Sequence, residues 1–212
     1  MSKRLVVLVS GEGTLLQNLI DAQTGEVQVT ATGVGGLGAE IVAVGADRDD
    51  IPALARARAA GIPVFVCRIS DYPDRARWDE ALTRSCAEFE PNLVVSAGFR
   101  KLFGERFLSE FDGRCVNSHP ALLPSFPGLF GVRDALRYGV KVTGCTIFFV
   151  DQGVDSGPVI AQAAVSVRDD DGEESLRERI KTAERELLVA TIRAMMTRGW
   201  SVSGRRVRIG GA

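Results

Sequence analysis

The sequence predicts an α/β fold built on a doubly wound, mostly parallel sheet, with an antiparallel extension in the C-terminal half. Apolar, β-branched runs such as RLVVLVS (residues 4–10) are typical of strands that are buried on both faces. These runs alternate with segments that carry leucine or alanine at helical spacing, which is the pattern of a parallel sheet with crossover helices. In the C-terminal half, two long β-type segments follow one another with only a short loop between them, which indicates antiparallel neighbours.

The first half alternates strands and helices in regular order, as parallel strands with helical crossovers require. Proline and glycine mark the helix ends: Pro52 begins one helix, Gly61 ends it, and Pro91 stops the next. We expect strands at residues 4–10, 40–48, 62–68 and 92–98, and helices at residues 14–23, 52–61 and 74–90. The glycine-rich stretch 25–38 fits neither class, and we interpret it as an inserted, flexible surface loop.

The second half predicts a short strand at residues 114–118 and two longer strands at 141–150 and 157–167, joined by a loop at 151–156. A long amphipathic helix follows at 173–199, with Gly199 as its stop. The tail after it either forms a short hairpin around Ser203–Gly204 or frays.

Composition excludes several classes of protein. A net charge of −1 argues against a general nucleic-acid binder, which needs a basic excess. No segment has the length of a membrane span or the pattern of a signal peptide, so we expect a cytoplasmic protein. Four cysteines are scattered along the chain and only one histidine is present, which favours free thiols and no zinc site; the cysteines are Cys67, Cys86, Cys115 and Cys145.

SGEGTLLQ (residues 10–17) lies between a predicted strand and a predicted helix. Its two glycines allow backbone N–H groups to face an anion at the helix N-terminus, and Thr14 adds a hydroxyl. The spacing is neither a dinucleotide fingerprint nor a Walker A loop, so a single phosphate fits better than a dinucleotide. Spacing alone leaves a plain strand-to-helix turn as an equal alternative.

Asn117, Ser118 and His119 leave a predicted strand together. An asparagine amide can donate to a developing oxyanion, and an imidazole can carry a proton near neutral pH. Residues i and i+2 of a strand point to one side, and open α/β sheets bind ligands at this carboxyl edge. The local sequence by itself favours the simpler alternative, a turn with a hydrogen-bonded surface histidine.

Two further segments carry both a functional and a structural interpretation. Asp151 and Asp155 lie in the loop between the long β segments, where a carboxylate can orient His119 and keep it cationic, or simply make the turn. AGFRKLF (residues 97–103) combines glycine, aromatic rings and two cations at the end of a predicted strand, and it fits either a wall of an acidic ligand's pocket or an ordinary helix start.

Taken together, five segments resemble the phosphoribosylglycinamide formyltransferase family, the folate-dependent enzymes of purine synthesis. They are VSGEGTLLQNLID (9–21), AGFRKLF (97–103), NSHPALLPSFPG (117–128), GVKVTGCTIFFVDQGVDSGPVIAQ (139–162) and RIKTAERELL (179–188), and the resemblance runs from about Lys3 to Thr197. It implies a Rossmann-like formyltransferase fold in a single domain, 1–212, with a phosphate-binding half at 1–100, a catalytic and folate-binding half at 101–200, and a tail at 201–212.

The resemblance also implies an acyl transfer without a covalent enzyme intermediate and without metal. The amine of glycinamide ribonucleotide attacks the formyl carbon of 10-formyltetrahydrofolate, the co-substrate, and a tetrahedral intermediate collapses to release tetrahydrofolate. The implied catalytic residues are Asn117 as oxyanion donor, His119 as the protonated acid, and Asp155, which holds His119 and orders a water.

The implied binding residues form two sets. The ribonucleotide set holds the phosphate and the ribose hydroxyls and comprises Gly11, Glu12, Gly13, Thr14, Leu15 and Glu184. The folate set comprises Arg75, Arg100, Lys101, Leu102, Phe103, Asn117, Asp151, Gln152, Gly153 and Val154. The expected partners are these two small molecules, with no nucleic acid and no membrane, for a monomer or homodimer.

The chain departs from the family pattern at several positions. Thr14-Leu15 stands where Ser-Asn is usual, Arg100-Lys101-Leu102-Phe103 stands where Met-Arg-Ile-Leu is usual, and Phe130 and Phe148 stand where histidine is frequent. None belongs to the Asn–His–Asp set, so we predict that activity survives. The rivals are a formyltransferase acting on methionyl-tRNA or a nucleotide sugar, a formyltetrahydrofolate hydrolase, and a catalytically weak folate- or nucleotide-binding protein.

Overall fold

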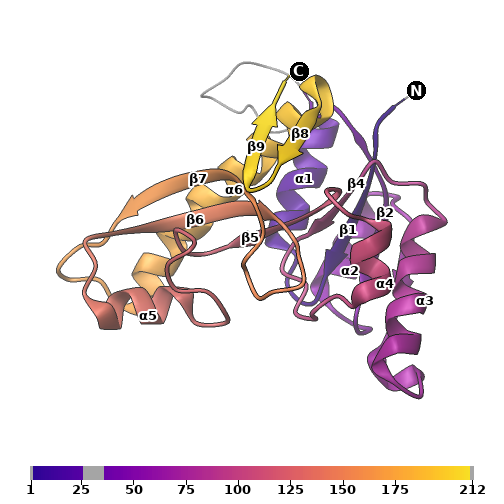
Figure 1. The fold of residues 1–212 in the computed structure, drawn as a ribbon, viewed down its shortest axis with the longest axis horizontal. Helices are drawn as coiled ribbons and strands as arrows, with labels where there is room; N and C mark the ends of the chain where they lie inside the picture. Colours follow the sequence, from indigo (N-terminus) through magenta and orange to yellow (C-terminus); the bar gives the residue numbers. More distant parts are fainter. Residues whose placement is uncertain (1, 26–35, 211–212) are drawn as a thin grey trace. The chain divides into compact units, whose positions relative to one another are not determined.

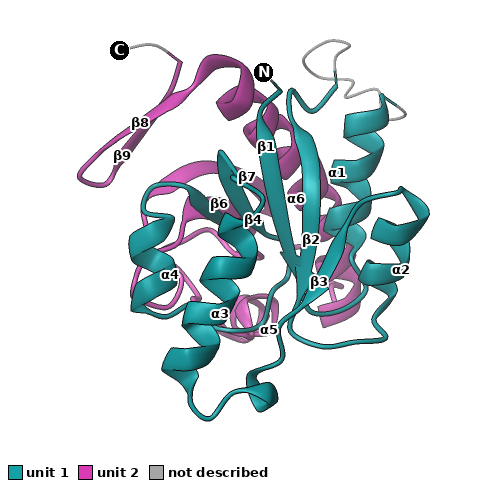
Figure 2. Cartoon of the chain, turned by 90° about the vertical axis from the view of Figure 1, so that its right-hand side faces the viewer, with its two compact units in different colours: residues 1–117 teal, residues 118–212 magenta. Residues whose placement is uncertain are grey.

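The computed structural model describes residues 2–25 and 36–210, and it divides into two compact units. Unit 1 comprises Met1–Asn117 and unit 2 comprises Ser118–Ala212 (Figure 2). Residues 26–35 of the predicted glycine-rich loop lie outside the described residues. The prediction of a single domain with halves that meet near residue 100 stays a prediction.

Unit 1 is built on parallel strands in the order β3-β2-β1-β4-β5. The strands are β1 (Arg4–Val9), β2 (Glu40–Ala46), β3 (Val64–Val66), β4 (Leu93–Ser96) and β5 (Cys115–His119), whose last two residues belong to unit 2. β1 lies between β2 and β4, and its residues 5–9 are fully buried. Each such valine or leucine contributes roughly 1.5–3 kcal/mol of burial, which explains why the most apolar run forms the central strand.

The helices of unit 1 form two pairs. α1 (Thr14–Thr24) contacts α2 (Pro52–Ala59), and α3 (Arg75–Ala87) contacts α4 (Glu105–Glu110). The chain steps from β1 to β3 in one direction and then returns past β1 to β4, so right-handed crossovers place the two pairs on opposite faces. Figures 1 and 2 show them on either side of β1 and β2, which confirms the doubly wound prediction.

Unit 2 contains the antiparallel pair β6 (Val142–Phe149) and β7 (Val159–Ser166), with the long helix α6 (Glu173–Arg198) running along both strands (Figure 1). α5 (Gly131–Tyr138) packs on α6. Their shared core is an apolar cluster that comprises Val132, Cys145, Leu176 and Ile180. The mostly parallel α/β class with antiparallel strands in the C-terminal half is therefore confirmed.

The tail forms a hairpin, β8 (Trp200–Ser203) paired with β9 (Arg206–Ile209), so the first of its two alternatives is correct. Gly204 turns the chain with a positive φ of 58°, a conformation that glycine adopts at little cost. All four cysteines are buried free thiols, as predicted. No helix among the described residues has the length and apolar character of a membrane span.

Three predicted boundaries were wrong, and three short elements were missed. The strand expected at 62–68 covers only Val64–Val66, the helix expected to reach residue 90 ends at Ala87, and β5 extends to His119. The missed elements are α4, α5 and the 3-10 turn Ile69–Asp71. α4 is six residues long, too short to build a clear helical period in the sequence. α5 is as long as the correctly predicted α2 and is strongly amphipathic, so its signal was present but overlooked.

Candidate functional site

The carboxyl ends of the parallel strands in unit 1 bring predicted site residues and two further polar residues, Ser10 and Asp47, to one edge. Ser10 follows β1, Asp47 follows β2, and residues 97–104 follow β4. Asn117 lies in β5 in register with Ser96 of β4. This is the edge at which open α/β sheets bind ligands.

The glycine turn 11–15 is shaped by a close approach to α2. Gly13 has a φ of 72°, and a Cβ on it would lie 2.6 Å from the Cβ of Ala53, so only glycine fits there. No atom lies within 4 Å of a Cβ built on Gly11, so this glycine is not required by packing.

The carbonyls of the turn are occupied by α2. The N–H of Ala53 donates to the Gly11 carbonyl over 3.2 Å, and Arg56 Nε donates to the Glu12 carbonyl over 2.9 Å. The first N–H groups of α1 have no intrahelical partner and begin at Thr14, where an anion would be stabilised. The side chain of Leu15 is half-buried, so contact with a phosphate would rest on its backbone.

The segment 100–103 is fixed residue by residue. The N–H of Arg100 donates to Ser10 Oγ over 2.9 Å, Lys101 Nζ lies 3.6 Å from Asp47 Oδ2, and Arg75 donates to the Leu102 carbonyl. The ring of Phe103 stacks between those of Phe99 and Phe107, with centroid distances of 5.5 and 4.2 Å.

The end of this segment is held by a buried carboxylate. Asp79 accepts hydrogen bonds from the N–H groups of Gly104 and Phe107 over 2.6 and 3.1 Å. A Cβ on Gly104 would lie 2.5 Å from the Asp79 carboxyl, so this position also requires glycine. The segment therefore has a defined backbone from its first to its last residue.

In unit 2, His119 is buried with only 4% of its surface exposed, and both ring nitrogens have partners. Nε2 lies 2.7 Å from the carbonyl oxygen of Phe126, and Nδ1 lies 3.3 Å from Asp155 Oδ2. A carbonyl oxygen only accepts, so Nε2 carries a proton. Asp155 therefore lies where it can act as the ion-pair partner of His119 Nδ1.

Asp155 is held for this contact by the segment that follows the histidine. The N–H of Gly128 donates to Asp155 Oδ2 over 2.7 Å. Asp155 itself has a φ of 51°, a left-handed conformation that costs a non-glycine residue about 1 kcal/mol and that persists where the surroundings fix it. A Cβ on Gly131 would lie 3.1 Å from His119 Nε2, so glycine leaves room for the imidazole.

Glu184 lies buried on α6 and accepts a hydrogen bond of 2.7 Å from the hydroxyl of Ser118. Burial raises the pKa of Glu184 above its usual range, although the Ser118 hydrogen bond and the charge of His119 partly oppose the shift. The adjacent strand residues 118 and 119 thus engage two acids, one on α6 and one in the loop after β6.

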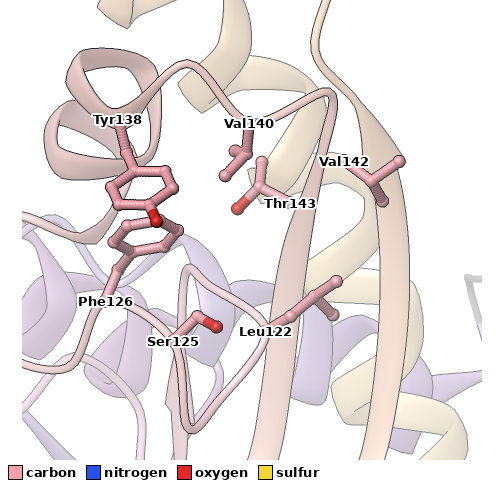
Figure 3. A pocket seen from close by; sticks show the side chains of 7 residues that line it. All are labelled: Leu122, Ser125, Phe126, Tyr138, Val140, Val142 and Thr143. Carbon is pink, nitrogen blue, oxygen red and sulfur yellow. The ribbon is translucent and has the colours of Figure 1, made fainter.

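One depression in unit 2 has Phe126, whose carbonyl contacts His119 Nε2, among its lining residues. It has a volume of about 380 Å³ and is lined by Leu122, Ser125, Phe126, Tyr138, Val140, Val142 and Thr143. Figure 3 shows the Phe126 and Tyr138 rings next to each other on one side of it, and their centroids lie 5.8 Å apart in an edge-on arrangement. None of the predicted site residues lines this depression.

Comparison with known proteins gives a consistent answer. The family model described as formyl transferase matches residues 3–192. The phosphoribosylglycinamide formyltransferase of Mycobacterium tuberculosis is 52% identical over 207 residues, which cover 98% of this chain and 91% of that protein. This chain is a member of the formyl transferase family.

Two further relatives extend the comparison. The trifunctional purine biosynthetic protein adenosine-3 of Drosophila melanogaster is 43% identical over 182 residues, which cover 86% of this chain and 13% of that protein. The crystal structure of glycinamide ribonucleotide transformylase 1 from Symbiobacterium toebii superimposes with a TM-score of 0.90 at 39% identity, covering 99% of this chain and 95% of that one. The formyl transferase resemblance and the enzyme class expected from the sequence are confirmed.

The predicted site residues of this formyl transferase are distributed over both units. Unit 1 holds the glycine turn, Arg75, the segment 100–103 and Asn117, and unit 2 brings Asp155 to His119. Asp151 is different: it accepts from the Gly153 N–H over 3.1 Å and from the Ser156 hydroxyl over 2.6 Å, so it makes the turn, as its simpler interpretation had it. The functional roles given to all these residues stay predictions.

The departures from the family pattern have different surroundings. Phe148 is buried in β6, whereas Phe130 is 51% exposed and lies under the Arg133 guanidinium at 3.8 Å. Arg100 is exposed, and its backbone N–H donates the hydrogen bond to Ser10 Oγ.

Several residues with clear structural roles escaped the sequence analysis. They are Ser10, Asp47, Arg56, Asp79, Phe126, Gly128 and Gly131. The proline- and glycine-rich run after His119 was a usable signal for the last three, because such runs indicate fixed backbone positions. The others act through contacts up to 90 residues away, which no local pattern reveals.

Proposed function

We propose that this chain transfers the formyl group of 10-formyltetrahydrofolate to the amine of glycinamide ribonucleotide in purine synthesis. The observation that carries the proposal is the buried His119, whose two ring nitrogens face the Phe126 carbonyl and the Asp155 carboxylate. In the proposal, His119 is the general acid of the acyl transfer and Asp155 is the carboxylate paired with it.

The chemistry follows from the charge that develops on the formyl oxygen. When the amine attacks the formyl carbon, the carbonyl oxygen becomes an oxyanion that needs hydrogen-bond donors. In the proposal, the amide of Asn117 donates to it, and His119 Nε2 exchanges the Phe126 carbonyl for the same oxygen. The proton lost by the amine then reaches the leaving folate nitrogen through His119, Asp155 and an ordered water, and the formyl C–N bond to folate breaks.

The binding roles rest on the fixed backbones in unit 1 and on Glu184. The N–H groups of residues 13–15 at the start of α1 take the phosphate of the ribonucleotide, and the nearby Arg56 adds positive charge. Glu184 accepts from the ribose hydroxyls, and the segment 100–103 with the loop 151–154 faces the pterin. The proposal needs no metal, no nucleic acid and no membrane, and it holds for a monomer or a homodimer in the cytoplasm.

Turnover tests the proposal directly. The protein is mixed with glycinamide ribonucleotide and 10-formyltetrahydrofolate, and formylated ribonucleotide is quantified by mass spectrometry while folate absorbance is followed. Stoichiometric formylation of the ribonucleotide is expected. Release of formate from 10-formyltetrahydrofolate without formylated product would instead identify a hydrolase, and binding of both molecules without turnover would identify a binding protein.

A further inference from the structure

Asp47 is a buried carboxylate that no part of the proposed chemistry uses. Its side chain is 0% exposed, and it lies one residue beyond the end of β2. Two cations reach it: Arg48 lies 3.0 Å from its Oδ2, and Lys101 Nζ lies 3.6 Å from the same oxygen. The Ser10 hydroxyl also acts on it, because it helps to lower the pKa of Asp47.

The charge on Asp47 is maintained despite its burial. Burial opposes ionisation, but hydrogen bonds from Arg48 and Ser10 and the charges of Arg48 and Lys101 outweigh it, so the pKa of Asp47 lies below its usual range. Asp47 is therefore an anion at neutral pH, able to accept from the Ser10 hydroxyl and to attract the Lys101 ammonium.

Two consecutive residues of the segment 100–103 are linked to the Asp47 carboxylate, one directly and one through Ser10. Lys101 contacts it directly. Arg100 is linked through Ser10, because the Ser10 oxygen accepts the Arg100 N–H over 2.9 Å and the Ser10 hydroxyl helps to lower the pKa of Asp47. A hydroxyl with a fixed proton presents its lone pairs in a fixed direction, so Asp47 sets where the segment begins.

The neighbouring glycine turn does not depend on the same contacts. It is tied to α2 through the Ala53 N–H and the Arg56 guanidinium, and the close approach of Gly13 to Ala53 fixes its backbone. A substitution at Asp47 should therefore displace the backbone of the segment 100–103 more than that of the turn 11–15.

We propose that Asp47 is a positioning residue which, through Ser10 and Lys101, sets the backbone of the segment 100–103 and thereby the affinity for the formyl folate. This inference rests on the proposed function, in which that segment faces the pterin. Asp47 itself does not touch the folate.

The test compares Asp47→Ala with Asp49→Ala. Asp49 lies on the same loop and carries the same charge, but its partner is the exposed Arg68. Steady-state kinetics with both substrates should show that Asp47→Ala raises the KM for 10-formyltetrahydrofolate by about tenfold, the scale of one or two lost hydrogen bonds to a charged group. The KM for glycinamide ribonucleotide and kcat should change by less than about threefold, and Asp49→Ala should match the wild type.

Two further variants keep the inference testable if Asp47→Ala folds poorly. Asp47→Asn keeps an acceptor for Ser10 but loses the attraction for Lys101, so its folate KM should lie between those of the wild type and Asp47→Ala. Ser10→Ala should weaken folate binding too. The double variant Ser10→Ala/Asp47→Ala should lose less than the sum of the two single changes, because both interrupt one chain of bonds.

The outcomes separate the inference from the proposed function. Lack of turnover by the wild type would contradict the proposed function, and direct calorimetric titration with 10-formyltetrahydrofolate would still test Asp47. An active wild type whose Asp47→Ala variant keeps its folate KM would overturn the inference alone. Equal increases in the KM of both substrates, or additive effects in the double variant, would also overturn it.

Discussion

Segment 100–103 in unit 1 and loop 151–156 in unit 2 are both short and irregular, and both are predicted to face the folate. They differ in how far along the sequence the residues that hold them lie. The segment is held by Ser10, Asp47, Arg75 and Asp79. Their hydrogen bonds, and the Asp47–Lys101 ion pair, join residues that lie 25 to 90 positions apart in the sequence. The loop is held mostly by Asp151, two and five residues from its partners.

This difference suggests that the segment and the loop contribute to different steps. A segment fixed by buried, distant groups keeps one backbone shape, which suits a surface that binds through its main chain. The loop closes mainly on itself, and its distant contacts are those of Asp155 with the Gly128 N–H and with His119, and of Arg205 with the carbonyls of residues 156 and 157. We therefore expect changes in the segment to affect binding and stability, and changes in the loop to affect turnover.

The largest expected effect lies in the loop and its histidine. His119→Ala and Asp155→Asn should each lower kcat by on the order of a hundredfold or more, the scale of general acid–base catalysis. Asp151→Asn changes the same charge in the same loop, but Asp151 only makes the turn, so its loss should stay below about tenfold. Single-turnover kinetics measures all three, and equal losses for Asp151→Asn and Asp155→Asn would remove the distinction between them.

The next largest effect is on stability in unit 1. Asp79→Ala leaves the N–H groups of Gly104 and Phe107 without their acceptor, so it should lower the free energy of unfolding by about 3 kcal/mol. Glu80→Ala removes the next acid, whose partner is the exposed Arg77, and should cost less than about 1 kcal/mol. Denaturant unfolding gives both values, and similar losses would show that the anchor of the segment is dispensable.

A pH-dependent effect is expected at Glu184. Its pKa is raised in the folded state, so as pH rises the unfolded carboxyl loses its proton first, and stability falls as pH passes from the unfolded pKa, near 4.5, towards the folded one. Glu184→Gln cannot ionise but still accepts from Ser118, so it should be more stable than the wild type at pH 7 and not at pH 4. The KM for glycinamide ribonucleotide should rise by about fivefold at pH 7.

Glu186→Gln is the matched control, since Glu186 lies on the exposed side of α6. Chemical denaturation of the wild type, Glu184→Gln and Glu186→Gln at pH 4 and pH 7 measures whether the buried charge of Glu184 lowers the free energy of unfolding. A gain for Glu184→Gln that is the same at both pH values would mean that the buried charge is not its origin.

The smallest effect is expected where the C-terminal hairpin meets the loop. Arg205 Nη2 donates to the carbonyls of Ser156 and Gly157 over 2.9 and 3.2 Å, directly after Asp155. Arg205→Ala should lower kcat by about threefold, because an exposed hydrogen bond contributes little. Arg206→Ala, the adjacent exposed arginine, should leave kcat unchanged, and equal kinetics for the two variants would show that the hairpin does not steady the loop.

The sequence by itself determined the fold class, the order of the long elements and the family. Central strand β1 and helix α6 were predictable because each buries a long run of apolar residues. The spacing of those residues can be read directly from the sequence. The motif residues Gly13, His119 and Asp155 were predictable because their chemistry is local to each residue type.

Only the tertiary structure showed the contacts that separate the acids. The resemblance to the family had already paired Asp155 with His119, but the local loop sequence leaves Asp151 and Asp155 alike. They differ because Asp151 bonds within its own loop, whereas Asp155 contacts Gly128 and the imidazole of His119. Asp47 and Asp79 carry no motif at all, and their roles come from partners far along the chain. The physical reason is that burial and hydrogen bonding are set by what surrounds a carboxylate in space, and a sequence records only its neighbours along the chain.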